Sequence, residues 1–284
     1  MDAVCHGKQW DVALVHDADG LITAAMPYHY ASRWGLRYIL QPQLTQFNGP
    51  WYRPGTDTAA AAQQLAAHFR SMRLLFFQQC FAPGTPIGPE WHDCTVVPRP
   101  TYRIDDIDDP QQVFLNFDKQ RRQRPIRRAG KELSPVSLSP QRFALFHAEY
   151  WASRGQRDLL SQDFMVHVIQ AALDRNQGIL LGVADQEGRL HAARFVAYDS
   201  QCAYALLSAL NPEGHANGAS PLLFWHIIQQ LSGHTRAFDF EGSRDPGIAF
   251  SYSLYGSHPT TYHQLTHYPL PLLRPLLKRK LDKK

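Results

Sequence analysis

The sequence predicts an α/β (α+β) protein in which one structural unit occurs twice. Apolar stretches of strand length alternate with alanine- or leucine-rich stretches of helical periodicity. Two apolar stretches around a turn occur near the start and again after residue 178, and each pair is followed by a helix, a strand and a Pro-Gly turn. The chain has 284 residues and is 44% hydrophobic, which is enough for one large domain or two ordinary ones.

The repeated hairpin is the first element of each copy. In the first copy, residues 10–15 and 21–26 are apolar and flank a turn; in the second, residues 180–183 and 190–198 do the same. The two hairpins align without gaps, which pairs Val15 with Val183, Asp17 with Asp185, Gly20 with Gly188, and Ala24-Ala25 with Ala192-Ala193. Agreement of several independent positions in one register predicts a duplication.

The elements after the hairpins continue the repeat. Residues 59–72 and 220–231 have the apolar spacing of helices. Strands are expected after Arg73 and after Arg236, and each leads to a Pro-Gly turn at the same distance, so that Phe77 falls on Phe240. Further helices are expected over 141–151, 162–176 and 248–255, and a last strand over 259–268.

Candidate catalytic residues lie where the second copy's late strand ends. Asp239 and Glu241 are two residues apart, so on a strand both side chains would project to one face. The first copy has Phe76 and Gln78 at these positions, which assigns the chemistry to the second copy. Tyr252 follows closely and is a candidate proton donor. Structural roles, with Glu241 capping a turn and Asp239 paired with an arginine, remain the alternative.

A cluster of seven basic residues lies between the two copies, within a helical stretch that Pro125 should kink or interrupt. No acidic residue separates the seven, so an anionic partner or acids elsewhere must compensate them. Phosphate is the expected partner, because guanidinium groups bind it through two parallel hydrogen bonds. The alternative is an exposed face balanced by the acidic stretch at 104–110. The seven are Lys119, Arg121, Arg122, Arg124, Arg127, Arg128 and Lys131.

The loop before the second copy's helix contains Asn217, Gly218, Ala219 and Ser220. Gly218 permits close approach of a ligand to the backbone, and free amides at a helix start bind phosphate. These four residues are therefore the candidates for binding the phosphates of an acyl donor. Ser220 and Pro221 also make an ordinary helix start, which explains the loop without a ligand.

Composition limits the remaining possibilities. No apolar run is long enough to cross a bilayer and the N-terminus lacks a signal-peptide core, so we expect a cytoplasmic protein. The four cysteines are scattered, and no spacing typical of metal ligands occurs, so we expect no metal. Residues 269–284 alternate leucine with lysine and arginine, which suits docking to the body or contact with an anionic membrane surface.

Three stretches resemble a known family. RRQRPIRRAGK (121–131), FDFEGSRDPGI (238–248) and YSLYGSHPTTY (252–262) are similar to motifs of the Fem-type peptidyltransferases and the BioF2-like acetyltransferase domain, which belong to the GNAT superfamily. Tyr252 stands where the Fem pattern has a lysine. The resemblance implies two tandem GNAT-like domains, each a mixed, mostly antiparallel sheet flanked by helices: a truncated one over 1–108 and an acyltransferase domain over 109–268, before the tail at 269–284.

The function that the resemblance implies is transfer of an acyl group to an amine. The donor would be an acyl-CoA such as acetyl-CoA, an acyl carrier protein or an aminoacyl-tRNA, and the acceptor a small or carrier-linked amine. Glu241 or Asp239 would take the amine proton, and Arg121, Arg122, Arg127 and Arg128 would hold an anionic substrate. One alternative is a non-catalytic relative that binds RNA or a membrane surface. Another is a single GNAT domain after an unrelated N-terminal domain. The sequence leaves the oligomeric state open.

Overall fold

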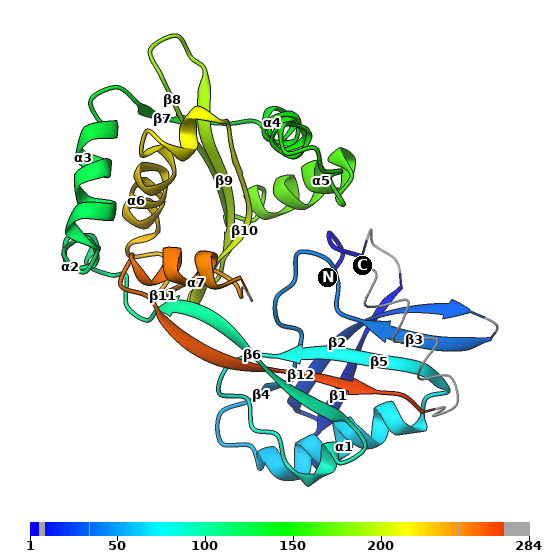
Figure 1. The fold of residues 1–284 in the computed structure, drawn as a ribbon. Helices are drawn as coiled ribbons and strands as arrows, with labels where there is room; N and C mark the ends of the chain where they lie inside the picture. Colours follow the sequence, from blue (N-terminus) through cyan, green and yellow to red (C-terminus); the bar gives the residue numbers. More distant parts are fainter. Residues whose placement is uncertain (6–8, 34, 243–244, 270–284) are drawn as a thin grey trace. The chain divides into compact units, whose positions relative to one another are not determined.

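The computed structural model describes residues 1–5, 9–33, 35–242 and 245–269 (Figure 1). Contacts divide the chain into two compact units. Among the described residues, unit 1 contains residues 1–99 and 261–269, and unit 2 contains residues 100–260. The predicted tail at 269–284 lies outside the described residues except for Pro269.

Unit 1 is a sheet with strand order β1-β2-β3-β5-β12, in which only β3 and β5 are parallel. Helix α1 packs the buried side chains Leu65 and Phe69 into the core of this unit, and Asp57 caps its N-terminus. Its elements are β1 (Trp10–His16), β2 (Ile22–Arg33), β3 (Leu36–Leu40), β4 (Trp51–Tyr52), α1 (Thr58–Ser71), β5 (Leu74–Phe81), η1 (Pro89–Trp91) and most of β12 (His258–His267).

Unit 2 is a sheet with strand order β6-β11-β10-β9-β8-β7, in which only β10 and β11 are parallel. Helix α6 covers one face, and α4 and α5 cover the other (Figure 1). Its elements are the end of β6 (Thr95–Ile104), α2 (Pro110–Leu115), η2 (Lys119–Gln123), α3 (Arg124–Ala129), β7 (Ser134–Ser137), α4 (Pro140–Ser153), α5 (Gln162–Leu173), β8 (Gly178–Ala184), β9 (Leu190–Tyr198), β10 (Cys202–Leu210), η3 (Glu213–His215), α6 (Ala219–Leu231), β11 (Ala237–Asp239), α7 (Pro246–Ser253) and the start of β12.

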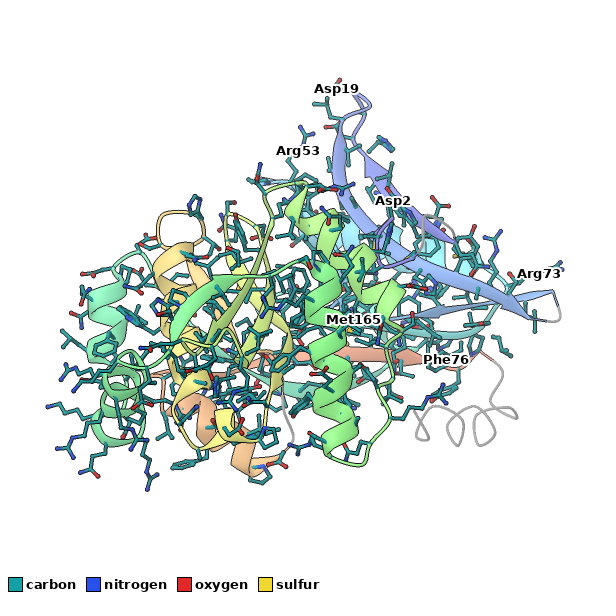
Figure 2. The ribbon with its side chains drawn as sticks, turned by 90° about the horizontal axis from the view of Figure 1, so that it is seen from above. Asp2, Asp19, Arg53, Arg73, Phe76 and Met165 are labelled. Atoms are coloured by element: carbon teal, nitrogen blue, oxygen red, sulfur yellow. The ribbon has the colours of Figure 1, made fainter. Side chains whose placement is uncertain are left out.

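The two hairpins have the same register and the same irregularity. Val15 pairs with Ala24 in unit 1, Val183 pairs with Ala192 in unit 2, and a bulge follows each pair. In both turns an aspartate Oδ1 accepts a hydrogen bond from the main-chain amide four residues later, at 2.9 Å for Asp17 and 2.8 Å for Asp185. Gly20 and Gly188 close the turns with φ of 81° and 79°. Asp19 marks the tip of the first hairpin in Figure 2.

The rest of each unit repeats the same connectivity. Strands β1-β2-β3, helix α1 and strand β5 correspond to β8-β9-β10, α6 and β11, with the parallel pair formed by the third strand and the strand after the helix. The predicted duplication is therefore confirmed, and an unrelated N-terminal domain is excluded. Each unit also receives a closing strand from the other half of the chain, because β12 pairs with β5 and β6 pairs with β11.

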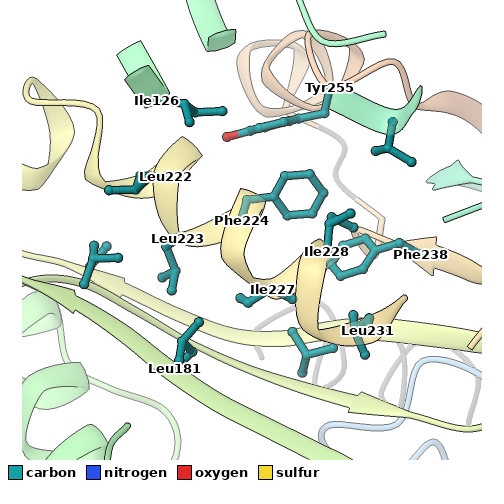
Figure 3. Packing of buried hydrophobic residues seen from close by; sticks show 14 of the residues in the cluster. Ile126, Leu181, Leu222, Leu223, Phe224, Ile227, Ile228, Leu231, Phe238 and Tyr255 are labelled. Atoms are coloured by element: carbon teal, nitrogen blue, oxygen red, sulfur yellow. The ribbon is translucent and has the colours of Figure 1, made fainter. Parts of the chain in front are cut away.

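The core of unit 2 is built around α6 (Figure 3). Phe224 and Ile227 of this helix are fully buried, and Phe224 contacts Phe238 of the sheet and Tyr255 after α7 at ring-centroid distances of 5.0 and 4.5 Å. Burial of large apolar side chains stabilises such a helix by roughly 1.5–3 kcal/mol per side chain. This packing holds α6, β11 and α7 together at the end of β11.

The basic stretch differs from a single interrupted helix. It forms three short segments, α2, η2 and α3, and η2 is a turn of π-helix immediately before Pro125. Asp118 accepts amide hydrogen bonds at the start of η2, and its carbonyl oxygen accepts from both Arg122 and Gln123 at 3.0 Å. Proline has no amide hydrogen to give a carbonyl in the preceding turn, which explains why the α-helical pattern restarts there.

No helix among the described residues is long and apolar enough to cross a membrane.

Candidate functional site

The candidate site lies where β10 and β11 separate. The two strands pair only from Cys202 to Tyr204 and from Ala237 to Asp239, and β11 ends at Asp239. A bulge in β10 after Tyr204 changes its register against β9. Beyond Tyr204, β10 has no strand partner on the β11 side among the described residues. The main-chain groups on that side of β10 are therefore available to an extended ligand.

Asp239 is fully buried at the end of β11. Its Oδ1 accepts a hydrogen bond from Thr101 Oγ1 at 2.5 Å and another from the main-chain amide of Glu241 at 2.7 Å. Asp239 pairs with Tyr204 and Arg103, whereas Phe238 pairs with Ala203 and Ile104 on the α6 face. Side chains alternate along a strand, so Asp239 points to the face opposite α6. Its contacts fix the turn that carries Glu241.

Glu241 lies beyond the strand, with a left-handed φ of 63°. The expectation that Asp239 and Glu241 share a strand face is therefore wrong: β11 ends two residues too early, and the turn re-aims Glu241. Burial, aided by the negative charge of Asp239, raises the pKa of Glu241 to about 8. A non-glycine residue in this conformation costs about 1–3 kcal/mol, and such strain concentrates at functional sites.

Tyr252 lies on α7 beside this turn. Its ring stacks on Phe240 with a centroid distance of 4.8 Å and contacts Tyr102 at 5.7 Å. Burial raises the pKa of Tyr252, Glu241 and Asp239 raise it further, and Arg194 opposes them. The hydroxyl therefore stays protonated at neutral pH, as a proton donor must.

The predicted phosphate loop is engaged within the protein. Asn217 Oδ1 accepts from the amide of Ala219 at 3.0 Å, and its Nδ2 donates to Nδ1 of the buried His191, 2.9 Å away. His191 Nε2 lies 3.0 Å from Asp185 Oδ2, and this hydrogen bond is the main cause that lowers the pKa of Asp185. Asn217 therefore links the β8–β9 turn to the start of α6.

Gly218 and Ala219 are both buried. A Cβ at Gly218 would lie 2.9 Å from the carbonyl oxygen of Pro125 on α3, so the close approach that this glycine permits is made by α3. Ser220 is hydrogen-bonded to Tyr255. Binding of donor phosphates by these four loop residues remains a prediction, and these contacts explain the loop without a ligand.

The four predicted substrate-binding arginines have different surroundings. Arg122 is half-buried: its guanidinium lies 4.3 Å from the ring centroid of Tyr255, and Nη2 donates to the carbonyl and hydroxyl oxygens of Ser251 at 2.8 and 2.7 Å. The guanidinium of Arg121 lies over the ring of Phe250, and that of Arg127 lies over the ring of Phe114. Arg121, Arg127 and Arg128 are all exposed. Arg122 therefore joins η2 to α7, while the others face solvent.

None of the seven clustered basic residues forms an ion pair with a described carboxylate. The acidic stretch does not balance them at short range. Asp105 pairs with Arg103 and His258, and Asp109 accepts the first amides of α2. The exposed basic residues of η2 and α3 therefore present positive charge to solvent without a short-range counter-ion from the described part of the chain.

Sequence reasoning missed Arg194. This arginine lies in the middle of the apolar strand β9, half-buried, with Nε donating to Ser208 Oγ on β10 at 2.8 Å. Its charge acts on both Tyr252 and Tyr255. A charged residue inside the run LHAARFVAY was the signal that could have identified it, because buried arginines are rare unless they have a partner.

Two cavities in unit 1, of about 260 and 390 Å³, contain none of the predicted site residues. We place the site at the end of β11 because the buried carboxylates and the open strand edge occur there. Within the described part of the chain, no group of three or more His, Cys, Asp or Glu side chains is arranged to hold a metal ion.

Residues 118–246 match the family described as acetyltransferase (GNAT) domain. A search of curated proteins finds no match. Among solved structures, FemX is similar with a TM-score of 0.74 and 10% sequence identity, over 96% of this chain and 92% of that one.

Two further structures share the fold. A tandem GNAT protein from the clavulanic acid biosynthesis pathway has a TM-score of 0.53 and 14% identity, over 90% of this chain and 82% of that one. The C-terminal domain of a lysylphosphatidylglycerol synthetase, described as putative, from Agrobacterium fabrum has a TM-score of 0.56 and 10% identity, over 95% of this chain and 89% of that one. At these identities the likeness establishes the fold, including its tandem arrangement.

Proposed function

We propose that this chain, whose residues 118–246 match an acetyltransferase (GNAT) domain, is an acyltransferase that transfers an acyl group to an amine with Glu241 as the base. One observation carries the proposal. A partly buried carboxyl group with a pKa raised to about 8 lies in a strained turn at the point where two parallel strands separate. A base whose pKa is near the working pH is well suited to take a proton from an ammonium or amine group.

The acyl donor fits the open edge of β10. Main-chain amides and carbonyls beyond Tyr204 can pair with an extended arm, as an added strand would. An acyl-CoA, an acyl carrier protein or an aminoacyl-tRNA each presents its acyl group on a flexible or extended end. The donor phosphates would lie near the start of α6, at Ser220. Of the other three predicted loop residues, Asn217 is already paired with His191, and Gly218 and Ala219 are buried.

The reaction balances with the residues present. Glu241 takes a proton from the nitrogen of the acceptor amine as this nitrogen attacks the carbonyl carbon of the donor. A C–N bond forms and the C–S or C–O bond to the carrier breaks. Tyr252, kept protonated by burial, would give its proton to the departing sulfur or oxygen and regain one from Glu241 through solvent. Asp239 acts by holding the turn, through the hydrogen bond from the Glu241 amide.

The uncompensated basic residues support an anionic carrier or substrate. Arg121, Arg127 and Arg128 are exposed on neighbouring segments, η2 and α3, and arginine binds phosphate groups in a bidentate manner. Binding to this face should weaken steeply with salt, because each phosphate contact releases a condensed counter-ion. The same observation favours the second candidate function, a non-catalytic protein that binds an anionic polymer.

The test is a donor screen followed by transfer assays. Thermal-shift measurements would compare acetyl-CoA, longer acyl-CoAs, acyl carrier protein and aminoacyl-tRNA, since a ligand at 100 times its Kd stabilises by about 2.7 kcal/mol. With the donor found, Glu241→Gln should lower kcat about 10²–10⁴-fold. Glu149→Gln, an exposed acid on α4, serves as the matched control.

The pH profile gives a second readout. The wild-type rate should rise with pH up to about 8, because Glu241 must be ionised to act, and Glu241→Gln should lose this rise. Full activity in Glu241→Gln would remove Glu241 as the base. Salt-sensitive RNA binding without any donor affinity would favour the non-catalytic candidate.

A further inference from the structure

Arg194 occupies an apolar face of the sheet. It lies between Ala192 and Val196 on β9, both completely buried, and these three side chains point toward α6. Across the sheet it pairs with Leu181 of β8 and Ser208 of β10. Nothing in the packing of this face requires a cation, because the neighbouring positions are filled by small and aliphatic side chains.

The guanidinium of Arg194 is only partly satisfied. Its Nε donates to Ser208 Oγ at 2.8 Å, and its Cζ lies 6.0 Å from the ring centroid of Phe224. No carboxylate of the described residues lies within ion-pair distance, and the two terminal nitrogens have no hydrogen-bond partner there. The two terminal nitrogens form the edge of the fork that matches a carboxylate or phosphate.

Physical cost argues for a ligand. A charge withdrawn from water without a counter-ion destabilises the protein, and apolar side chains of similar size would fill the position without that cost. A half-buried arginine with a free edge is therefore the arrangement expected where an anion binds from outside. The exposed arginines of η2 and α3 differ in this respect, because solvent already hydrates them.

Position ties Arg194 to the proposed base. Phe224, which contacts Arg194, lies 4.8 Å from Phe240, and Phe240 stacks on Tyr252 at 4.8 Å. Glu241 directly follows Phe240. One small molecule over these rings could thus present an anionic group to Arg194 and an amine to Glu241. Ser208 lies on the stretch of β10 that has left β11, so the anion would lie next to the opened strand edge.

We propose that Arg194 binds the carboxylate of the acceptor, so that the acceptor is a molecule of the amino-acid type carrying both an amine and a carboxylate. This inference rests on the proposed acyl transfer and specifies its substrate class. It uses no residue of the basic cluster. Arg194 is then a specificity-determining residue, and the reacting atoms are handled by Glu241 and Tyr252.

The experiment measures binding of product-like ligands, which does not depend on turnover. N-acetyl amino acids and their carboxamides, which lack the negative charge, are titrated by calorimetry against the full chain. The wild type should bind at least one N-acetyl amino acid roughly 10- to 100-fold more tightly than its carboxamide, as expected for a charge-assisted bidentate contact. Arg194→Met should abolish this preference, and Arg194→Lys should retain part of it. Arg175→Met, in the exposed turn that follows α5, should leave it unchanged.

Each remaining outcome is informative. Equal affinity of carboxylates and carboxamides for the wild type, or no binding of any carboxylate in the set, would overturn the inference. Loss of affinity for CoA but not for pantetheine in Arg194→Met would assign the anion to the donor phosphates instead. If amines are acylated regardless of a carboxylate, the inference fails while the proposed function stands. If no amine is acylated although carboxylates bind through Arg194, the proposed function fails instead. Melting curves of both Arg194 variants check that they fold, and Arg194→Lys keeps the test decisive if Arg194→Met does not.

Discussion

Glu241 combines two unfavourable features, a left-handed backbone conformation and a carboxyl group partly withdrawn from water. Asp239 and Tyr252 face it from β11 and α7, and Asp239 adds negative charge. Arg194 on β9 acts on Tyr252 and is not among the causes of the Glu241 shift. The folded chain thus holds a proton on Glu241 that the unfolded chain would release near its ordinary pKa of 4.5.

Stability should therefore fall as pH rises through this range. Below pH 4.5 both states carry the proton, and between pH 4.5 and about 8 only the folded state does, so the free energy of unfolding decreases with increasing pH. The Glu241→Gln variant should not show this decrease in the free energy of unfolding, because glutamine does not titrate. The stability of the variant relative to wild type should increase by on the order of 2–4 kcal/mol between pH 5 and pH 9.

Urea denaturation at several pH values measures this difference. Glu149→Gln, whose side chain is exposed, should follow the wild type at every pH. A stability difference between Glu241→Gln and wild type that does not change with pH would contradict the raised pKa of Glu241.

At the scale of single residues, the sequence predicted Asp239 and Glu241 as catalytic candidates because the first copy lacks the two acids, and Tyr252 because it follows them closely. It could not tell which acid is free to act. Asp239 is held by Thr101, 138 positions away in the chain, and such a long-range hydrogen bond leaves no local pattern. Arg194 was missed because the absence of a counter-ion is a property of three-dimensional neighbours.

At the scale of elements, Arg122 connects η2 to α7 through Tyr255 and Ser251. Arg122→Ala should lower the free energy of unfolding by about 2 kcal/mol, since it loses a cation–π contact and charged hydrogen bonds. Arg121→Ala is the matched control on the same turn, and its exposed contact with Phe250 should contribute less than about 1 kcal/mol. Denaturant unfolding measures both. Equal effects would mean that Arg122 has no special structural role and is better explained by substrate binding.

Two glycines that flank α6 allow the free-energy cost of backbone strain to be measured separately from the cost of a steric clash. Gly218 and Gly233 flank the helix with φ of 86° and 77°, but only Gly218 has a neighbour within contact distance of an added Cβ, the carbonyl oxygen of Pro125. Gly233→Ala should cost about 1 kcal/mol from strain alone. Gly218→Ala should cost about 2–4 kcal/mol, because α3 must also move. Thermal unfolding that shows equal costs would mean that α3 adjusts freely against α6.

The hairpins were the elements that sequence predicted best. Their register depends on local turn chemistry, an aspartate and a glycine at fixed positions, and on alternating side chains. The end of β11 was predicted less well. A strand ends where its hydrogen-bonding partner ends, and β11 ends where β10 stops pairing with it. The end of β11 therefore depends on residues of β10 that lie more than 30 positions earlier in the chain.

At the scale of the whole molecule, the two halves of the chain exchange their closing strands. A fragment of residues 109–257 would lack β6, and with it the partner of Phe238, the hydrogen bond from Phe240 to Tyr102 and the hydroxyl donor to Asp239. A fragment of residues 95–257 keeps all three. Only the longer fragment should melt cooperatively and protect amides 237–241 from hydrogen exchange. Equal melting and protection in both fragments would show that β6 is dispensable for this end of unit 2.

The domain limits predicted at residues 108 and 268 assume that each domain is one continuous segment of the chain. These limits keep each copy continuous, whereas contacts place residues 261–269 with unit 1 and residues 100–104 with unit 2. Strand exchange between duplicated halves has no sequence signal, because an exchanged strand has the same apolar pattern as one that pairs within its own copy.

The sequence by itself determined the α/β class, the duplication, the copy that retains acidic residues and the resemblance to GNAT acyltransferases, because periodicity, turn residues and motif spacing are local properties of a chain. Only the tertiary structure decided that Asp239 supports a turn, that Glu241 carries a raised pKa beside it, that the α6 loop is already engaged and that Arg194 has no counter-ion among the described residues. Those properties depend on burial and on which distant groups come within hydrogen-bond distance, and neither is a function of position along the chain.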